Sequence, residues 1–166
     1  MNIVLIGYRG TGKSTVGRQL AARLGRALVS TDEEIVKRAQ RMIPEIVAQE
    51  GWEYFRDLES EICREIASRD QLVIDTGGGA ILRAQNVEVL KKNGTLIWLT
   101  ASVETITKRI GGDDQRPSLT GTKSFVDEIE DVLRVRMPKY QAAAQHTVVT
   151  DGLTAHQLAE TLLSLT

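Results

Sequence analysis

The stretch GYRGTGKST at residues 7–15 directly follows the mostly apolar run NIVLI at residues 2–6. Short apolar runs of this kind are typical of a strand that is buried on both faces of a parallel sheet. The glycines at positions 7, 10 and 12 permit a tight turn, and a helical pattern over residues 13–24 begins directly after them. The order of strand, glycine-rich turn and helix predicts an α/β protein.

The same stretch matches the P-loop pattern, because four residues separate Gly7 from Gly12-Lys13-Ser14. Successive backbone N–H groups and the positive end of the helix would cradle a phosphate. The Lys13 ammonium would reach the β- and γ-phosphates, and the Ser14 hydroxyl would ligate Mg²⁺. A glycine-rich turn that binds nothing is the alternative, and the offset of Gly-Lys-Ser disfavours it. We expect the ATP-binding residues to be Gly10, Thr11, Gly12, Lys13, Ser14 and Thr15.

Strand and helix patterns alternate along the chain. This alternation predicts parallel strands joined by right-handed crossovers, with helices on both faces of a five-stranded sheet. We expect one domain over residues 1–166. The strand patterns begin at residues 2, 27, 71, 95 and 146. The helical patterns cover residues 13–24, 83–92, 102–110, 124–144 and 154–165. Residues 32–69 also have a helical pattern, which is interrupted near Pro44 and Gly51.

Composition excludes several classes of protein. The chain is 42% hydrophobic and 26% charged, as in ordinary soluble domains. Its net charge of −1 argues against nucleic-acid binding, which usually needs a basic excess. No run approaches the roughly 18 apolar residues of a membrane span, and no secretory signal is expected at the start. With Cys63 alone no internal disulfide can form, and this favours a cytoplasmic location. As a separate expectation, the protein is a monomer.

The segment 111–123 is rich in glycine and contains Pro117, and it has little apolar content. This composition predicts a mobile loop. Small P-loop kinases close a lid over the nucleotide, and an arginine in the lid neutralises charge on the transferred group. We therefore predict that 111–123 is a lid and that Arg116 has a catalytic, ATP-contacting role. A solvated loop charge is the alternative for Arg116.

Further candidates for binding the phosphate acceptor lie outside the P-loop. Asp32 follows the second strand and could aim into a cleft. The same stretch also fits a helix capping box, formed either by Ser30 with Glu33 or by Thr31 with Glu34. Arg56 could bind an anion or form an ion pair with Glu53 or Glu59.

The triple glycine Gly77-Gly78-Gly79 follows the third strand. It would therefore lie at the carboxyl edge of the sheet, where ligands of open α/β sheets bind. Near the other end of the chain, Arg136 could bind an anion or serve as a charge near a helix C-terminus.

Together these residues resemble the shikimate kinase family, and the likeness covers nearly all of the chain. The matching elements are residues 7–15, Asp32, Phe55-Arg56, Gly77-Gly78-Gly79, Arg116-Pro117 and Arg136-x-Pro138-x-Tyr140. The resemblance implies a three-layer P-loop kinase fold and ATP-dependent phosphorylation of the 3-hydroxyl of shikimate, in aromatic amino acid biosynthesis. It implies shikimate and ATP as ligands, Mg²⁺ as cofactor, and no nucleic-acid or membrane partner.

The resemblance also assigns roles to individual residues. Lys13, Asp32 and Arg116 would be catalytic, and region 31–60 would bind substrate. Arg56 and Arg136 would grip the carboxylate of shikimate, since guanidinium forks match it bidentately, and Gly77, Gly78 and Gly79 would approach its ring. Arg109 resembles the position that stacks on adenine, with a helix C-terminal charge as the alternative.

The chain departs from the family pattern in two places. Family members often carry Asp-x-Asp after the second strand, with the first acid near Mg²⁺, whereas Ser30 stands here. Asp75 at the end of the third strand is an additional acid, and we hypothesise that it holds a Mg²⁺-bound water in place of the missing one. An unrelated strand-end aspartate is the alternative. No arginine occurs within residues 150–154, where some members place one against adenine.

Other functions remain open alternatives at this point. One is a gluconate-type or nucleoside monophosphate kinase, although aromatic residues for stacking a nucleotide acceptor are only 4% of the chain. Another is a non-catalytic relative that senses nucleotide and metabolite, although Lys13, Ser14, Asp32 and Arg116 argue against it. A third, an RNA-directed P-loop protein, conflicts with the net charge of −1. We interpret Trp52 and Trp98 as packing residues and His146 and His156 as surface or edge residues.

Overall fold

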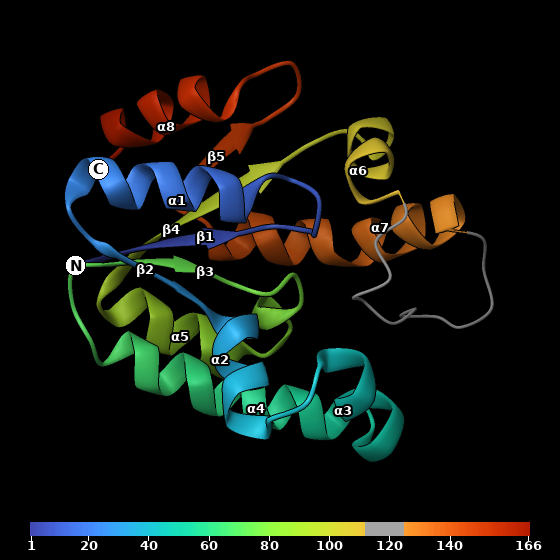
Figure 1. Ribbon diagram of the computed structural model, residues 1–166. Helices are drawn as coiled ribbons and strands as arrows, with labels where there is room; N and C mark the ends of the chain where they lie inside the picture. The colour runs from blue at the N-terminus through green and yellow to red at the C-terminus, as the bar shows by residue number, and fades with distance from the viewer. Residues whose placement is uncertain (112–124) are drawn as a thin grey trace.

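The computed structural model describes residues 1–111 and 125–166 (Figure 1). A parallel sheet with the strand order β2-β3-β1-β4-β5 lies at the centre. The five parallel strands confirm the expected fold class. Their bounds are β1 Asn2–Ile6, β2 Ala27–Ser30, β3 Leu72–Asp75, β4 Gly94–Thr100 and β5 His146–Val149.

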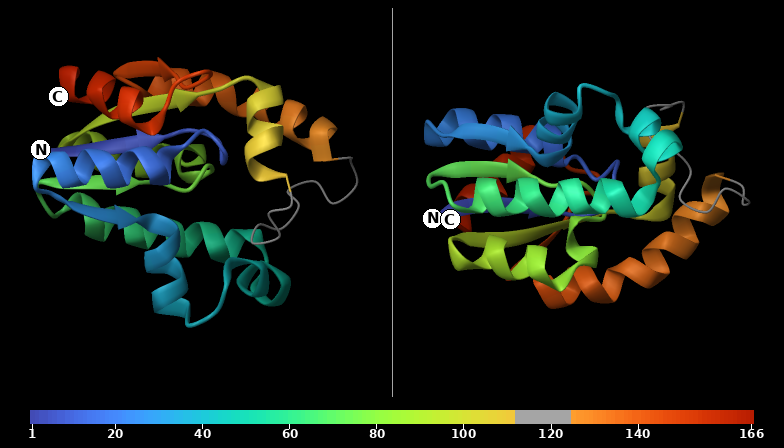
Figure 2. Two further views of the ribbon diagram at one scale, coloured as in Figure 1. Left: turned by 45° about the horizontal axis from the view of Figure 1, so that its top comes forward. Right: turned by 90° about the horizontal axis from the view of Figure 1, so that it is seen from below.

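Helices cover both faces of the sheet. In Figures 1 and 2, α1 and α8 lie together on one side of it, and α4 and α5 lie on the other. The region 32–69 is interrupted near Pro44 and Gly51 as expected. The helices are α1 Lys13–Leu24, α2 Thr31–Ala39, α3 Ile43–Glu50, α4 Trp52–Ala67, the 3₁₀ turn η1 Ala80–Leu82, α5 Ala84–Lys92, α6 Val103–Ile110, α7 Phe125–Ala143 and α8 Ala155–Ser164.

The central strand β1 explains why the sheet needs both helical layers. Ile3 and Leu5 pack into a cluster with α1 and α8, whereas Val4 and Ile6 point to the opposite side and pack into a cluster with α4 and α5. Successive side chains of a strand alternate between its two faces, so the continuous apolar run NIVLI supplies both cores. None of the described helices is long and apolar enough to cross a membrane.

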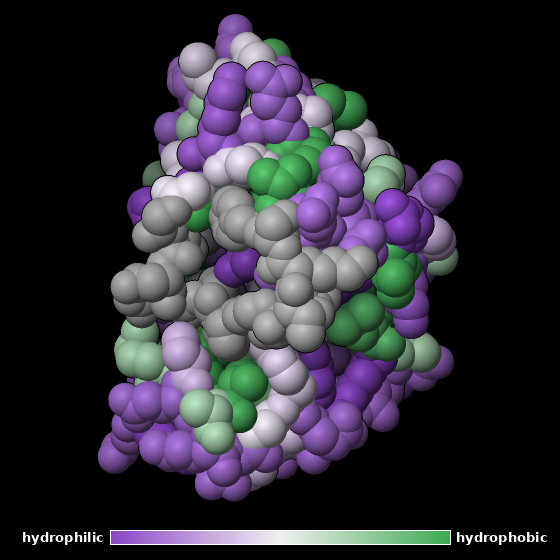
Figure 3. All heavy atoms as spheres, turned by 90° about the vertical axis from the view of Figure 1, so that its right-hand side faces the viewer, coloured by the Kyte–Doolittle hydropathy of each residue, from purple (hydrophilic) through white to green (hydrophobic). Residues whose placement is uncertain are grey.

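The strand order brings three loops together at one edge of the sheet. Because β3 pairs with both β1 and β2, the segments that follow these three strands leave the sheet side by side. A third, smaller hydrophobic core lies next to these loops, and in it Tyr8 from the loop after β1 packs with side chains of α6 and α7. Figure 3 faces this edge and shows hydrophilic side chains along much of its outline, with smaller apolar patches between them.

Candidate active site

Residues 7–12 form the predicted turn between β1 and α1. Gly10 and Gly12 have φ angles of 81° and 94°, which side-chain-bearing residues rarely adopt. Lys13 bends back over the turn, where its Nζ donates to the carbonyl oxygens of Gly7 and Tyr8 at 2.8 and 3.0 Å. The lysine side chain is thus buried at the mouth of the loop, beside the backbone groups expected to face phosphate.

The turn forms one wall of a pocket with about 1170 Å³ of empty space, including the part open to solvent. Of the predicted ATP-binding residues, Gly10, Gly12, Lys13, Ser14, Thr15 and Arg109 line it. Thr11 differs, because its side chain is buried and donates to the Tyr8 carbonyl at 2.8 Å. Only the backbone of Thr11 could contribute to binding a phosphate.

Arg109 lies in the last turn of α6, and its side chain reaches back to the P-loop. Its guanidinium donates to the Gly10 carbonyl at 3.2 Å and to the Thr150 hydroxyl at 3.1 Å. The carboxylate of Asp151 accepts hydrogen bonds from Ser102 at the start of α6. Both ends of α6 are therefore tied to neighbouring loops, and Arg109 is held at the rim of the pocket.

Two oxygen-bearing side chains in the lining of this pocket are hydrogen-bonded to each other. The Ser14 hydroxyl donates to Asp75 Oδ2 at 2.5 Å, and Asp75, at the end of β3, is only 6% exposed. Hydroxyl and carboxylate oxygens suit a hard cation such as Mg²⁺. The donor set therefore fits the metal that the P-loop pattern implies.

Asp32 lies in the first turn of α2, which begins directly after its N-cap residue Ser30. Ser30 caps the helix by accepting from the Glu33 N–H at 3.3 Å, while Asp32 lines the nucleotide pocket. A Cβ added to Gly77 would lie 2.8 Å from Asp32 Oδ1, so the acid borders the glycine turn. The Gly77 N–H also donates to the Thr31 hydroxyl at 2.9 Å. These contacts hold the loops after β2 and β3 together.

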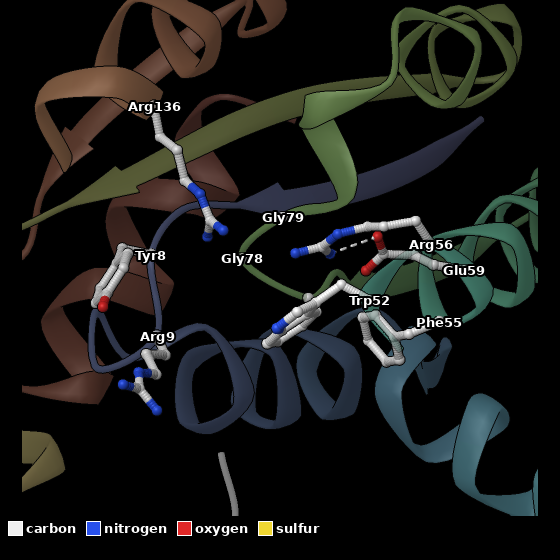
Figure 4. A pocket seen from close by; sticks show the side chains of 10 residues that line it. Tyr8, Arg9, Trp52, Phe55, Arg56, Glu59, Gly78, Gly79 and Arg136 are labelled. Carbon is white, nitrogen blue, oxygen red and sulfur yellow. Dashed lines mark hydrogen bonds and ion pairs between the residues drawn. The ribbon is translucent and has the colours of Figure 1, made fainter. Parts of the chain in front are cut away.

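A second pocket adjoins the first and shares Arg9 and Gly78 with it. It holds about 430 Å³ of empty space, counting the part open to solvent. Figure 4 shows Arg56 from α4 and Arg136 from α7 pointing toward the Gly78–Gly79 turn from different sides. The remaining lining residues are Tyr8, Trp52, Phe55, Glu59 and Gly77.

Arg56 forms the ion pair with Glu59 that its spacing allowed, at 2.8 Å, and it also lines the pocket. Its guanidinium lies 5.2 Å from the ring centres of both Trp52 and Phe55. Burial raises the pKa of Glu59, and the charge of Arg56 opposes that rise. The Glu59 carboxylate thus holds the Arg56 guanidinium in its orientation, and the aromatic rings of Trp52 and Phe55 lie beside that guanidinium.

Arg136 lies within α7, which continues to Ala143, so it is not a charge at a helix terminus. Its side chain is largely buried in the pocket. One helical turn later, the Tyr140 hydroxyl donates to the Gly78 carbonyl at 2.5 Å. The Tyr140 ring stacks on Trp98, with centroids 5.7 Å apart. One face of α7 therefore both supports the glycine turn and presents Arg136 over it.

Five residues of the acceptor pocket were not predicted individually as site residues: Tyr8, Arg9, Trp52, Phe55 and Glu59. Trp52 packs against the core and contacts Phe55 edge to face, as its interpretation as a packing residue expects, and it also lines the acceptor pocket. Its position four residues before Arg56 places both on one helix face, and this signal could have identified it. Trp98 is a packing residue as expected.

Both histidines are in the expected positions. His146 begins the edge strand β5, and exposed His156 contacts Arg23. The predicted lid at 111–123 and its residue Arg116 fall almost entirely within residues 112–124, outside the described part of the chain. Those predictions remain predictions.

Comparisons with known proteins agree with this geometry. A family model described as shikimate kinase matches residues 9–166. A shikimate kinase of Nitratidesulfovibrio vulgaris is 46% identical over 153 residues, which are 90% of this chain and 87% of that protein.

Solved structures are similar over nearly the whole length. The shikimate kinase from Acinetobacter baumannii in complex with shikimate has a TM-score of 0.94 at 40% identity, over 99% of this chain and 91% of that one. The shikimate kinase from Bacteroides thetaiotaomicron has a TM-score of 0.90 at 30% identity, over 99% and 97% of the two chains. With its P-loop, acidic residue, glycine turn and paired arginines arranged around adjoining pockets, this chain belongs to the shikimate kinase family.

Proposed function

We propose that this protein transfers the γ-phosphoryl group of ATP to the 3-hydroxyl of shikimate, yielding shikimate 3-phosphate and ADP in aromatic amino acid biosynthesis. The observation that carries the proposal is that the P-loop pocket and the arginine-lined pocket adjoin at Arg9 and Gly78. An acceptor in the second pocket would lie next to the terminal phosphate in the first. Such positioning supplies much of the rate enhancement in phosphoryl transfer.

The acceptor pocket suits a small hydroxylated carboxylic acid. Arg56 and Arg136 bind the carboxylate through charge-assisted hydrogen bonds, and the bare backbone of Gly78 and Gly79 leaves room for the ring. Region 31–60 acts as the substrate-binding region, since it contributes Asp32, the Trp52 ring and Arg56. We expect the protein to act as a monomer.

Asp32 orients the attacking hydroxyl and accepts its proton. The hydroxyl oxygen forms a bond to the γ-phosphorus, the bond from that phosphorus to the β,γ-bridging oxygen breaks, and ADP departs. Lys13 binds the β- and γ-phosphates, and Arg109 binds the nucleotide at the rim of its pocket. Arg116, predicted from the sequence, would add a further cation.

Mg²⁺ is the proposed cofactor, and Ser14 with Asp75 would hold it. When bound, the ion neutralises charge on the β- and γ-phosphate oxygens.

The test is ADP release in the presence of ATP, Mg²⁺ and one acceptor at a time, with ³¹P NMR of the product. Shikimate should release ADP in equimolar amounts with shikimate 3-phosphate, while gluconate and nucleoside monophosphates should not. Asp32→Asn should lower kcat by about 10²- to 10⁴-fold and leave shikimate binding nearly intact. Equal turnover with gluconate, or binding of shikimate and ATP without turnover, would overturn the proposal.

A further inference from the structure

The end of β3 places a buried carboxylate inside a pocket built for phosphates. Asp75 is 6% exposed, lines the pocket beside Lys13, and accepts the Ser14 hydroxyl hydrogen at 2.5 Å. A carboxylate at this position repels a polyphosphate, because solvent screens a buried charge much less than an exposed one. The acid is compatible with tight nucleotide binding only if a cation lies between it and the phosphates.

The neighbouring strand end carries no charge of its own. Ser30 is the partner of Asp75 in the parallel pairing of β2 with β3, and both residues line the same pocket. Partners in adjacent strands are about 5 Å apart, so a carboxylate on either strand would face the same volume. Of these two paired positions, Ser30 supplies a hydroxyl and Asp75 supplies the carboxylate, although a carboxylate at either position would face the pocket.

We propose that Asp75 is the acidic group of this protein's divalent-cation site: it holds a cation-bound water and orients the Ser14 hydroxyl as a direct ligand. The inference deepens the proposed function and rests on it for the identity of the nucleotide. Mg²⁺ usually keeps several waters and takes few protein ligands beside the phosphates. A single hydroxyl and a carboxylate hydrogen-bonded to it match that coordination.

The geometry predicts that neutralising Asp75 strengthens the binding of ADP without metal and weakens the binding of the metal to the ADP complex. Removing the charge in Asp75→Asn should strengthen ADP binding in EDTA, because a repulsion is lost. The same substitution should raise about tenfold the Mn²⁺ concentration that half-saturates the ADP complex, the scale of losses around metal ligands. A merely structural defect would weaken both kinds of binding.

The measurement is a titration of Mn²⁺ by electron paramagnetic resonance with ADP and no shikimate, beside calorimetry of ADP in EDTA. Glu33→Gln is the matched control, because it removes an exposed carboxylate from the rim of the same pocket. It should change Mn²⁺ affinity by less than about twofold, since solvent screens exposed charges.

A relocation variant separates the charge from its position. Ser30→Asp with Asp75→Ala moves the acid to the paired strand, and aspartate caps helices about as well as serine. It should recover most of the Mn²⁺ affinity that Asp75→Ala alone loses. An unchanged Mn²⁺ midpoint in Asp75→Asn, or equal weakening of ADP with and without metal, would overturn the inference. Since shikimate is absent, failure of the wild type to phosphorylate shikimate would contradict the proposed function and leave this result standing.

Discussion

The guanidinium group of Arg56 occupies the space that a side chain on Gly79 would need. A Cβ built on Gly79 collides with the end of the Arg56 side chain, which the Glu59 carboxylate holds in place at 2.8 Å. The glycine is therefore required by the position of the arginine rather than by its own backbone, whose φ of −98° is open to other residues.

This relationship predicts a binding defect in Gly79→Ala. The added methyl group should displace Arg56 and raise the KM for shikimate about tenfold, which corresponds to ~1.4 kcal/mol. The KM for ATP should change by less than about twofold, because Gly79 does not line the nucleotide pocket. Steady-state kinetics with each substrate varied in turn measures both values.

A double-mutant cycle tests the cause. In an Arg56→Ala background, Gly79→Ala should have almost no further effect on the KM for shikimate, because the group that it displaces is already gone. Additive effects of the two substitutions would show that Gly79 acts independently of Arg56.

Trp52 should report on shikimate binding. Its ring lies beside the Arg56 guanidinium in the acceptor pocket, whereas Trp98 is buried against Tyr140. A carboxylate that binds Arg56 changes the charge next to the Trp52 indole, so shikimate should produce a saturable change in tryptophan emission. Trp52→Phe should abolish the change while phosphorylation of shikimate continues. A signal that persists in Trp52→Phe contradicts this placement.

Arg109→Ala should affect the nucleotide and spare the acceptor. The substitution removes the hydrogen bonds to Gly10 and Thr150 and one wall of the nucleotide pocket. We expect the KM for ATP to rise about five- to tenfold, which corresponds to a loss of about 1–1.4 kcal/mol in charged hydrogen bonds. The KM for shikimate should stay within about twofold, and an equal rise in both KM values would argue against a nucleotide-specific role.

The carboxylate of Asp151 predicts a pH-dependent part of the stability. Hydrogen bonds from Thr105 and Ser102 lower its pKa below the ordinary value of 3.8. Its contribution is therefore complete above about pH 4 and disappears as the pH falls through the lower, folded-state pKa. Because solvent still screens this half-buried group, we expect Asp151→Ala to cost only about 0.5–1 kcal/mol at pH 7, or roughly 1–4 °C in Tm.

Thermal unfolding of both proteins at several pH values measures this contribution. The difference in Tm between wild type and Asp151→Ala should shrink as the pH drops below about 4. Asp151→Asn keeps an acceptor for the Thr105 hydroxyl but has no charge to lose, so its Tm difference from Asp151→Ala should not depend on pH. A gap between wild type and alanine variant that stays constant in acid would contradict the role given to the charge.

Local patterns in the sequence predict the elements and much of the site. The P-loop, the helix cap at Ser30 and the strand run NIVLI each depend on residues close together in the chain, so their structures follow from local geometry. The approach of Arg56 and Arg136 was expected through the family resemblance. Spacing alone does not place α4 and α7 on opposite sides of one glycine turn.

What the sequence does not predict depends on contacts between distant segments. The strand order is set by packing across the sheet, and so is the pairing of Ser30 with Asp75. The hydrogen bond from the Tyr140 hydroxyl to the Gly78 carbonyl joins two residues that are 62 positions apart in the sequence. The place of Trp52 in the pocket follows from the way α4 meets the loop after β3. A pattern of single residues therefore indicated which groups matter, and the tertiary structure showed which of them share a pocket.

The central claim is that two guanidinium groups bind the carboxylate of shikimate next to the P-loop. The most direct measurement is kcat/KM for shikimate and for its methyl ester, which keeps the ring and the hydroxyls but has no charge. We predict that the wild type prefers the acid about 100-fold or more, and that Arg136→Ala loses most of this preference, since breaking a buried charge pair costs several kcal/mol. Equal kcat/KM values for acid and ester in the wild type would contradict the account.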